Sequence, residues 1–108
     1  MSQNNLAIIL SGGLGKRFDE KLPKQFYKLN NKHILEISVE KFIKSNLFKK
    51  IIVVTSSEFM NLTKEILEKK SVQIVTGGET RQKSVLNGLV KGKRYKIDNV
   101  LIHDAARP

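Results

Sequence analysis

Four short apolar runs, separated by segments with helical spacing, limit the folds that are open to this chain. The runs are rich in β-branched residues and too short for buried helices, which is typical of strands covered on both faces of a sheet. They occupy residues 6–10, 51–54, 72–75 and 100–102. Strands that alternate with helices connect through right-handed crossovers into a mainly parallel sheet. We therefore predict an α/β fold of three layers, α/β/α, with helices on both faces of the sheet.

Three helices are predicted from apolar residues that recur every three or four positions. The first covers about residues 33–44, the second begins at a Ser57 cap, and the third covers about residues 80–91. The residues expected to face inward are Leu35, Val39, Phe42 and Ile43, then Phe59, Leu62 and Ile66, then Val85, Leu86 and Leu89. No helix follows the fourth run, so we expect one face to lack cover and interpret residues 1–108 as the N-terminal part of a single larger domain.

The charge balance indicates an anionic partner. The chain has 20 Lys and Arg against 10 Asp and Glu, a formal net charge of +10. Nucleic acid, an acidic membrane surface and a phosphorylated metabolite all meet this condition. The chain has no cysteine and no apolar run near the roughly 20 residues that span a bilayer, so we expect a cytoplasmic protein without membrane contact.

The loop after the first apolar run has the composition of a phosphate site. It contains Gly12, Gly13 and Gly15, and glycine lets a phosphate approach main-chain N–H groups directly because it has no Cβ. Arg17 and Lys24 add positive charge close by. A flexible, cationic loop of this kind suits a nucleoside triphosphate.

Two further loops carry polar residues at the ends of predicted strands. One has a Gly77-Gly78 pair followed by a short polar stretch, and the other has Asp104 and Arg107. Open parallel sheets bind ligands at the carboxyl edge of their strands, where these loops would meet the first one. We expect all three to form a single site.

Three motifs together resemble one enzyme family. They are Ser11–Arg17 with Pro23-Lys24-Gln25, the segment Gly77–Val85, and the ending His103–Pro108. In this combination they are similar to 2-C-methyl-D-erythritol 4-phosphate cytidylyltransferases, and the last two motifs are the specific ones. The resemblance implies a Rossmann-like nucleotidyltransferase fold and transfer of a cytidylyl group from CTP to methylerythritol phosphate, with release of pyrophosphate. It also implies a Mg²⁺ ion and a homodimer whose partner contributes an arm to the site.

The resemblance assigns roles to the first loop. The residues implied to contact the nucleotide or shape the loop around it are Ser11, Gly12, Gly13 and Gly15. Arg17 and Lys24 are the implied catalytic residues, which hold the triphosphate and stabilise charge on the departing pyrophosphate. The family pattern has an alanine pair where this chain has Ser11-Gly12.

The other two motifs receive roles in the same way. The residues implied to contact cytosine, ribose or the rest of the nucleotide are Gly78, Glu79, Ser84 and Ala105. Asp104 is the implied Mg²⁺ ligand, and Arg107 would face the methylerythritol phosphate. Direct in-line attack on the α-phosphorus needs no nucleophilic side chain, so positioning and charge neutralisation would supply the catalysis. By itself, the chain of 108 residues is expected to bind CTP weakly at most and not to turn over.

Three alternatives stay open at this point. A ribitol 5-phosphate or other sugar-phosphate cytidylyltransferase shares much of the layout. A basic nucleic-acid-binding module would interleave cations with exposed aromatic residues, whereas Phe42 and Phe59 fall on predicted apolar faces. A dinucleotide-binding domain would carry G-x-G-x-x-G in its first loop and an acidic residue after its second strand, and this chain has neither.

Overall fold

The computed structural model describes residues 4–12 and 22–107, and within these ranges four parallel strands form one sheet in the order β5-β4-β1-β6. The strands are β1 (Asn5–Ser11), β4 (Lys50–Thr55), β5 (Gln73–Thr76) and β6 (Asn99–Asp104). Every neighbouring pair of these strands is parallel. The predicted parallel sheet is confirmed.

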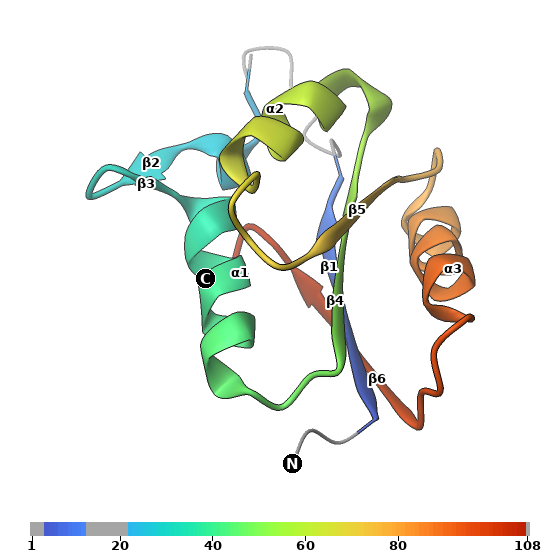
Figure 1. Ribbon diagram of the computed structural model, residues 1–108. Coiled ribbons are helices and arrows are strands. Elements are labelled where there is room, and N and C mark those ends of the chain that lie inside the picture. The colour runs from blue at the N-terminus through green and yellow to red at the C-terminus, as the bar shows by residue number, and fades with distance from the viewer. Residues whose placement is uncertain (1–3, 13–21, 108) are drawn as a thin grey trace.

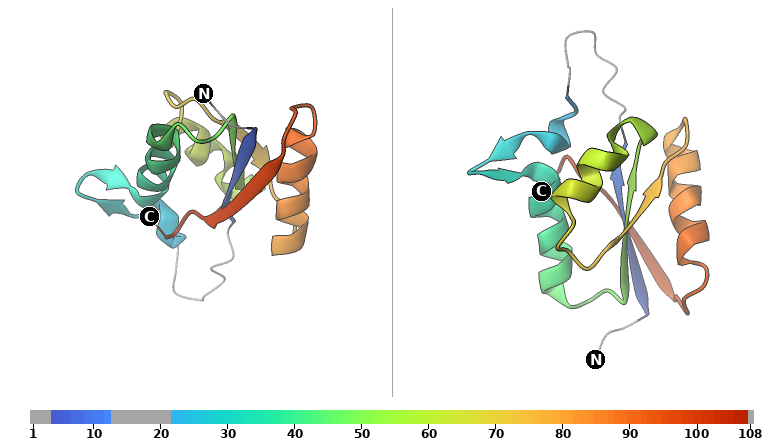
Figure 2. Two further views of the ribbon diagram at one scale, coloured as in Figure 1. Left: turned by 90° about the horizontal axis from the view of Figure 1, so that it is seen from below. Right: turned by 45° about the horizontal axis from the view of Figure 1, so that its top comes forward.

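Helices cover both faces of this sheet (Figure 1). α1 (Ile34–Ser45) and α2 (Met60–Ile66) lie on one face, and α3 (Arg81–Gly92) lies on the other (Figure 2). Side chains of β1 divide between the two layers: Ala7 and Ile9 join the core on the α1 side, whereas Leu6 and Ile8 join the core on the α3 side. Burial on both faces explains why the first run is apolar at every position, and the predicted three layers are confirmed.

Two features near α1 and α2 differ from expectation. A small antiparallel hairpin, β2 (Lys28–Leu29) with β3 (Lys32–His33), precedes α1 and turns through Asn30 and Asn31 at φ 53° and 68°. The predicted Ser57 cap is wrong. Ser57 belongs to a 3-10 turn, η2 (Ser57–Phe59), that runs directly into α2, and no side chain caps that helix. A second 3-10 turn, η1 (Lys24–Phe26), lies before the hairpin.

α3 meets the sheet through small residues instead of the predicted leucines. Ser84, Gly88 and Gly92 are its buried residues, and a Cβ on Gly88 would meet Ile8 Cγ2 at 3.0 Å. Leu86 and Leu89 were expected to face inward, but they are 55% and 38% exposed. Because these three residues are small, the axis of α3 comes close to β1 and β4. The face of α3 that contacts the sheet is therefore the one with the small residues and not the one with the leucines.

Part of the sheet also remains uncovered at β6, an edge strand whose residues Val100, Leu101 and Ile102 are all exposed. Val100 and Ile102 pair with Leu6 and Ile8 and face the α3 side, whereas Leu101 pairs with Ala7 and faces the α1 side. The expectation that one whole face lacks cover is therefore wrong: helices cover both faces, and the exposed surface is confined to the β6 edge. Among the described residues, no helix combines the length and apolarity that a membrane span requires.

Candidate active site

The carboxyl ends of the strands bring three of the predicted loops to one edge of the sheet. Ser11 pairs in register with Thr55, and Thr55 pairs with Thr76. On the other side of β1, Leu10 pairs with Asp104. Gly12 and Ala105 therefore follow the neighbouring strands β1 and β6, and Gly77 follows β5, which β4 separates from β1, so all three lie at the carboxyl edge of the sheet. Gly13, Gly15 and Arg17 lie outside the described residues.

The first part of the site is the end of β1, which is held by a residue from η1. Ser11 is almost fully buried, and its Oγ accepts a hydrogen bond of 3.3 Å from Gln25 Nε2. The same Nε2 lies 3.2 Å from the carbonyl oxygen of Gly12. Lys24, the residue that precedes Gln25 in the turn, is exposed. Gln25 thus brings the turn that carries Lys24 to the end of β1.

The second part is the loop between β5 and α3. The Gly77 N–H donates to the Thr55 carbonyl, which fixes the loop against β4. The Gly78 N–H donates to Ser84 Oγ at 3.1 Å, and Ser84 is itself buried. Glu79 is almost fully exposed, with its carboxylate 4.0 Å from Lys83 Nζ. Gly78, Glu79 and Ser84 therefore form one turn, with the acidic side chain in solvent.

The third part is the turn after β6. The Ala105 N–H donates to the Leu10 carbonyl, and Ser38 Oγ of α1 donates to the Ala105 carbonyl, both at 2.9 Å. Arg107 N–H donates to the Asp104 carbonyl, and His103 Nε2 bonds the Arg107 carbonyl. Ala105 has no exposed surface, so the structure places it in the core and not at a ligand surface. Asp104 and Arg107 project from a turn fixed at several points.

Asp104 is paired with a cation from the neighbouring helix. Arg81 Nη2 lies 3.5 Å from Asp104 Oδ1, and the two side chains are 55% and 42% exposed. Within residues 4–12 and 22–107, no three Asp, Glu, His or Cys residues gather closely enough to enclose a metal ion. A single carboxylate suits a Mg²⁺ ion that takes its other ligands from substrate phosphates and water. The residues at this edge fit a metal site that takes most of its ligands from substrate and water, and not a site built from protein side chains alone.

Sequence reasoning assigned no role to three residues that shape this edge, which are Gln25, Ser38 and Arg81. Gln25 and Arg81 stand inside the recognised motifs, so their position was available as a signal. Ser38 lies at helical spacing between Leu35 and Val39 on the inner face of α1 and is completely buried. A hydroxyl at an otherwise apolar helix position was the signal for a buried hydrogen bond.

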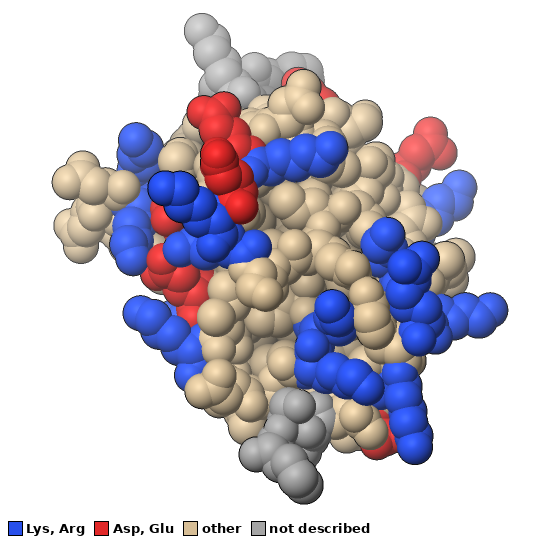
Figure 3. Space-filling model, in the orientation of Figure 1, with Lys and Arg blue, Asp and Glu red and all other residues tan. Residues whose placement is uncertain are grey.

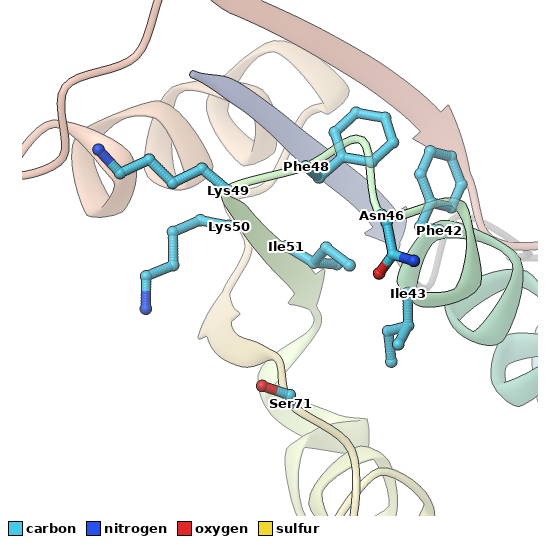
Figure 4. A pocket seen from close by; sticks show the side chains of 8 residues that line it. All are labelled: Phe42, Ile43, Asn46, Phe48, Lys49, Lys50, Ile51 and Ser71. Carbon is cyan, nitrogen blue, oxygen red and sulfur yellow. The ribbon is translucent and has the colours of Figure 1, made fainter. Parts of the chain in front are cut away.

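A cavity of about 170 Å³ lies at the opposite edge of the sheet (Figure 4). It opens where β4 begins, and it is lined by Phe42, Ile43, Asn46, Phe48, Lys49, Lys50, Ile51 and Ser71. None of the predicted site residues borders it. Figure 3 shows basic side chains gathered over α3 and the segment after it, towards the amino ends of the strands. Phe42 packs against Phe48 with ring centroids 5.2 Å apart, and Tyr95, in the segment after α3, lies under Lys50 Nζ at 4.6 Å from its ring centroid, so these three rings make contacts within the protein.

Comparison with known proteins gives one consistent result. A sequence model of the family "2-C-methyl-D-erythritol 4-phosphate cytidylyltransferase" matches residues 6–108. The enzyme of that name from Thermosipho melanesiensis is 43% identical over 109 residues, covering 96% of this chain and 48% of the relative. That of Petrotoga mobilis is 45% identical, covering 94% of this chain and 47% of the relative.

A solved structure agrees with these relatives. The 4-diphosphocytidyl-2C-methyl-D-erythritol synthase of Anaerococcus prevotii superposes with a TM-score of 0.73 at 29% identity, covering 96% of this chain and 44% of that one. The chain thus spans about half the length of the relatives that it matches. From the family match and these identities, the chain belongs to the 2-C-methyl-D-erythritol 4-phosphate cytidylyltransferase family.

Proposed function

We propose that this chain forms the CTP-binding part of an enzyme that transfers a cytidylyl group to 2-C-methyl-D-erythritol 4-phosphate. The observation that carries the proposal is the convergence of the Gly12, Gly78 and Asp104 loops at one sheet edge, in the register given above. Family membership supports the chemistry, and the span of half a relative supports the interpretation of residues 1–108 as the N-terminal part of one domain.

The reaction is an in-line displacement at phosphorus. A phosphate oxygen of the sugar alcohol phosphate bonds to the α-phosphorus of CTP, and the bond from that phosphorus to the bridging oxygen breaks. Pyrophosphate leaves with the electron pair, giving 4-diphosphocytidyl-2-C-methyl-D-erythritol. Because negative charge gathers on the leaving group, cations fixed beside it accelerate the step.

The proposal assigns a role to several residues of the candidate active site. Lys24 holds the triphosphate, and the main chain of Gly12 and Gly78 lets the nucleotide approach closely. Ser84 keeps the Gly78 loop in place through its hydrogen bond, and exposed Glu79 is free to accept from the cytosine amino group. Arg107, exposed on its turn, receives the phosphate of the second substrate.

Asp104 would hold the Mg²⁺ ion together with oxygens of the triphosphate. When bound, the ion supplies charge neutralisation at the phosphates and a fixed orientation for them. Arg81, 3.5 Å from Asp104 Oδ1, keeps that carboxylate at the mouth of the site. The proposal also includes the homodimer that the resemblance implies and the cytoplasmic location expected from the composition.

An NMR titration of the ¹⁵N-labelled protein tests nucleotide binding. We expect CTP with Mg²⁺ to shift the Gly12, Gly78 and Asp104 amides together, and ATP to shift them less. Lys24→Ala removes a charge-assisted contact, so CTP affinity should fall roughly 10- to 100-fold. Lys44→Ala, which removes an exposed lysine in the last turn of α1, is the matched control. Equal affinity of Lys24→Ala and Lys44→Ala would contradict the assignment of Lys24.

Substrate choice needs a transfer assay. The enzyme containing this chain should release pyrophosphate from CTP with methylerythritol phosphate and much less with ribitol 5-phosphate. There, Lys24→Ala should lower kcat more than it weakens CTP binding, because the leaving group gains charge in the transition state. Faster transfer to ribitol 5-phosphate would instead favour the alternative substrate.

A further inference from the structure

Gln25 is a buried polar side chain that joins two separate segments at the candidate active site. It is only 5% exposed, and its Nε2 faces two acceptors at the end of β1, Ser11 Oγ at 3.3 Å and the Gly12 carbonyl at 3.2 Å. Since Gln25 has almost no accessible surface to offer a ligand, we expect its contribution to the site to act through neighbouring residues.

The turn that carries Gln25 leaves it little freedom. Phe26 N–H donates to the Pro23 carbonyl and Tyr27 N–H donates to the Lys24 carbonyl, each at 3.0 Å, which closes η1 at both ends. The Phe26 ring is buried, with its centroid 5.1 Å from that of Phe59 in η2. Two adjacent residues of this turn thus point inward and anchor it, whereas Lys24 points outward.

We propose that Gln25 is a positioning residue that sets the place of Lys24 relative to the Gly12 main chain. This inference rests on the proposed function, in which Lys24 and Gly12 grip the same triphosphate. Two anchors locate η1: the Phe26 ring holds it against η2, and the Gln25 amide holds it against β1. Without the second anchor, the turn could pivot about the first, and Lys24 would lose its fixed distance to the end of β1.

The hydrogen-bond chemistry requires an amide at this position. The Gly12 carbonyl can only accept, so the atom facing it must donate, as the NH₂ group of Gln25 does. A glutamate of the same shape would present a carboxylate oxygen to that carbonyl and repel it. Ser11 provides the second acceptor, and alanine at this position would remove it. The proposal therefore predicts a graded series, in which Ser11→Ala has a small effect and Gln25→Leu and Gln25→Glu have larger ones.

A matched control separates this positioning role from general stability. Gln73 is a partly buried glutamine at the start of β5, and its Nε2 donates to Tyr95 Oη at 2.9 Å. Gln73→Leu removes one side-chain hydrogen bond of a similar kind at the far edge of the sheet. It should leave nucleotide binding unchanged, and its melting temperature, measured beside that of Gln25→Leu, separates lost stability from lost positioning.

The test is a double-mutant cycle on CTP affinity, read by NMR titration of the intact chain. We expect Gln25→Leu to bind CTP about tenfold more weakly than the parent, which corresponds to one lost contact. In the Lys24→Ala background, Gln25→Leu should cause little further loss, because the residue acts through Lys24. Independent losses that multiply, or a Gln25→Leu affinity equal to that of Gln73→Leu, would overturn the proposal.

Ligand-free spectra keep the inference distinct from the proposed function. Gln25→Leu should shift the amide resonances of Gly12 and Lys24 and increase the fast motion of Lys24, with β5 and α3 unaffected. If the parent protein binds no CTP, the proposed function fails and these spectra decide the positioning role. Unchanged Gly12 and Lys24 resonances would then refute it.

Discussion

At the residue scale, the Gly77-Gly78 pair is a steric requirement of the loop between β5 and α3. A Cβ on Gly77 would lie 2.6 Å from Ser84 Oγ, and one on Gly78 would collide with Lys83 Cβ in the first turn of α3. Neither position has room for a side chain, because the loop folds directly back onto the helix. The hydroxyl of Ser84 occupies the space that a Cβ on Gly77 would need, and Lys83 occupies the space beside Gly78.

Gly78→Ala is therefore expected to lower stability by about 1–3 kcal/mol, since the helix must shift to admit the methyl group. CTP affinity should fall with it, because the Gly78 N–H would leave Ser84. Thermal unfolding and the CTP titration measure the two effects. Gly92→Ala, at the other end of α3, is the control, since its Cβ would meet side-chain ends and no backbone or Cβ atom, with Leu6 Cδ2 of β1 at 2.7 Å and Ile52 Cδ1 of β4 at 3.5 Å. A Gly78→Ala variant as stable as the Gly92→Ala control would contradict this account.

The sequence was sufficient to predict that Gly78 and Asp104 lie at one edge of the sheet, because each follows or ends a strand that local pattern identifies. It was not sufficient for Gln25 and Ser38, whose partners lie 13 and 67 positions away. Their hydrogen bonds exist only once the strands are aligned, so neither pattern nor propensity predicts them. The burial of Ala105 has the same origin, because its main chain is held by both β1 and α1.

At the element scale, α3 begins at a side-chain cap beside the candidate active site. Thr80 Oγ1 accepts a hydrogen bond of 3.1 Å from the Lys83 N–H. Removing this acceptor in Thr80→Ala should cost about 1 kcal/mol, and Thr80→Ser should retain most of that stability. Chemical denaturation measures both variants. A Thr80→Ser variant as unstable as Thr80→Ala would show that the methyl group, not the cap, is responsible.

Glu40 of α1 ties three segments together. Its carboxylate accepts from Lys32 of the hairpin at 2.8 Å and from Lys70, which precedes β5, at 2.7 Å. Hydrogen bonds from Lys32 and then Lys70 lower the pKa of Glu40 from 4.5 to about 2. A lowered pKa stabilises the folded protein above the unfolded value, and this gain disappears as the pH falls from about 4.5 towards 2.

Glu40→Gln should therefore lower stability by about 1 kcal/mol at neutral pH, and the difference from the parent should vanish in acid. Unfolding by urea between pH 7 and pH 2 measures this. Glu58→Gln, at an exposed residue of η2, is the control for the loss of a surface carboxylate. If Glu40→Gln and the parent differ equally at every pH, the ion pairs are not the cause.

The element predictions failed where packing overrode local pattern. Leu86 and Leu89 fit an apolar helical stripe, but glycines at 88 and 92 allow a closer approach along a different stripe. Ser57 is a good capping residue, yet the chain enters α2 through a 3-10 turn that uses no side-chain cap. In both cases a favourable local signal competes with a tertiary contact that the sequence does not reveal.

At the scale of the whole molecule, the open side of β6 and α3 is the main departure from a fully covered sheet. The exposed apolar residues on these two elements are Leu86, Leu89, Val90, Val100, Leu101 and Ile102. Exposed apolar side chains promote association, and an unpaired edge strand adds free hydrogen-bonding groups. The net charge of +10 opposes close approach of two copies, so salt should strengthen association.

We expect the protein to bind a hydrophobic dye in its folded state and to self-associate increasingly with salt. The double variant Leu86→Lys and Val90→Glu should reduce both without loss of stability, because both side chains are exposed. Leu29→Lys changes an equally exposed leucine of the hairpin and should leave both unchanged. Sedimentation velocity at low and high salt measures the association. A parent chain that stays monomeric at high salt and ignores the dye would contradict this reading of the surface.

The position of β6 has a consequence for the chemistry as well. Asp104 ends β6, an edge strand whose outer flank is unpaired in the described sheet, so the carboxylate that would hold the cation stands at a boundary between sheet and solvent. Any polypeptide laid along that flank would exclude water from Asp104 and strengthen its attraction for a cation. Binding of a polypeptide along β6 would therefore raise the affinity of Asp104 for a metal ion without itself contacting the ion.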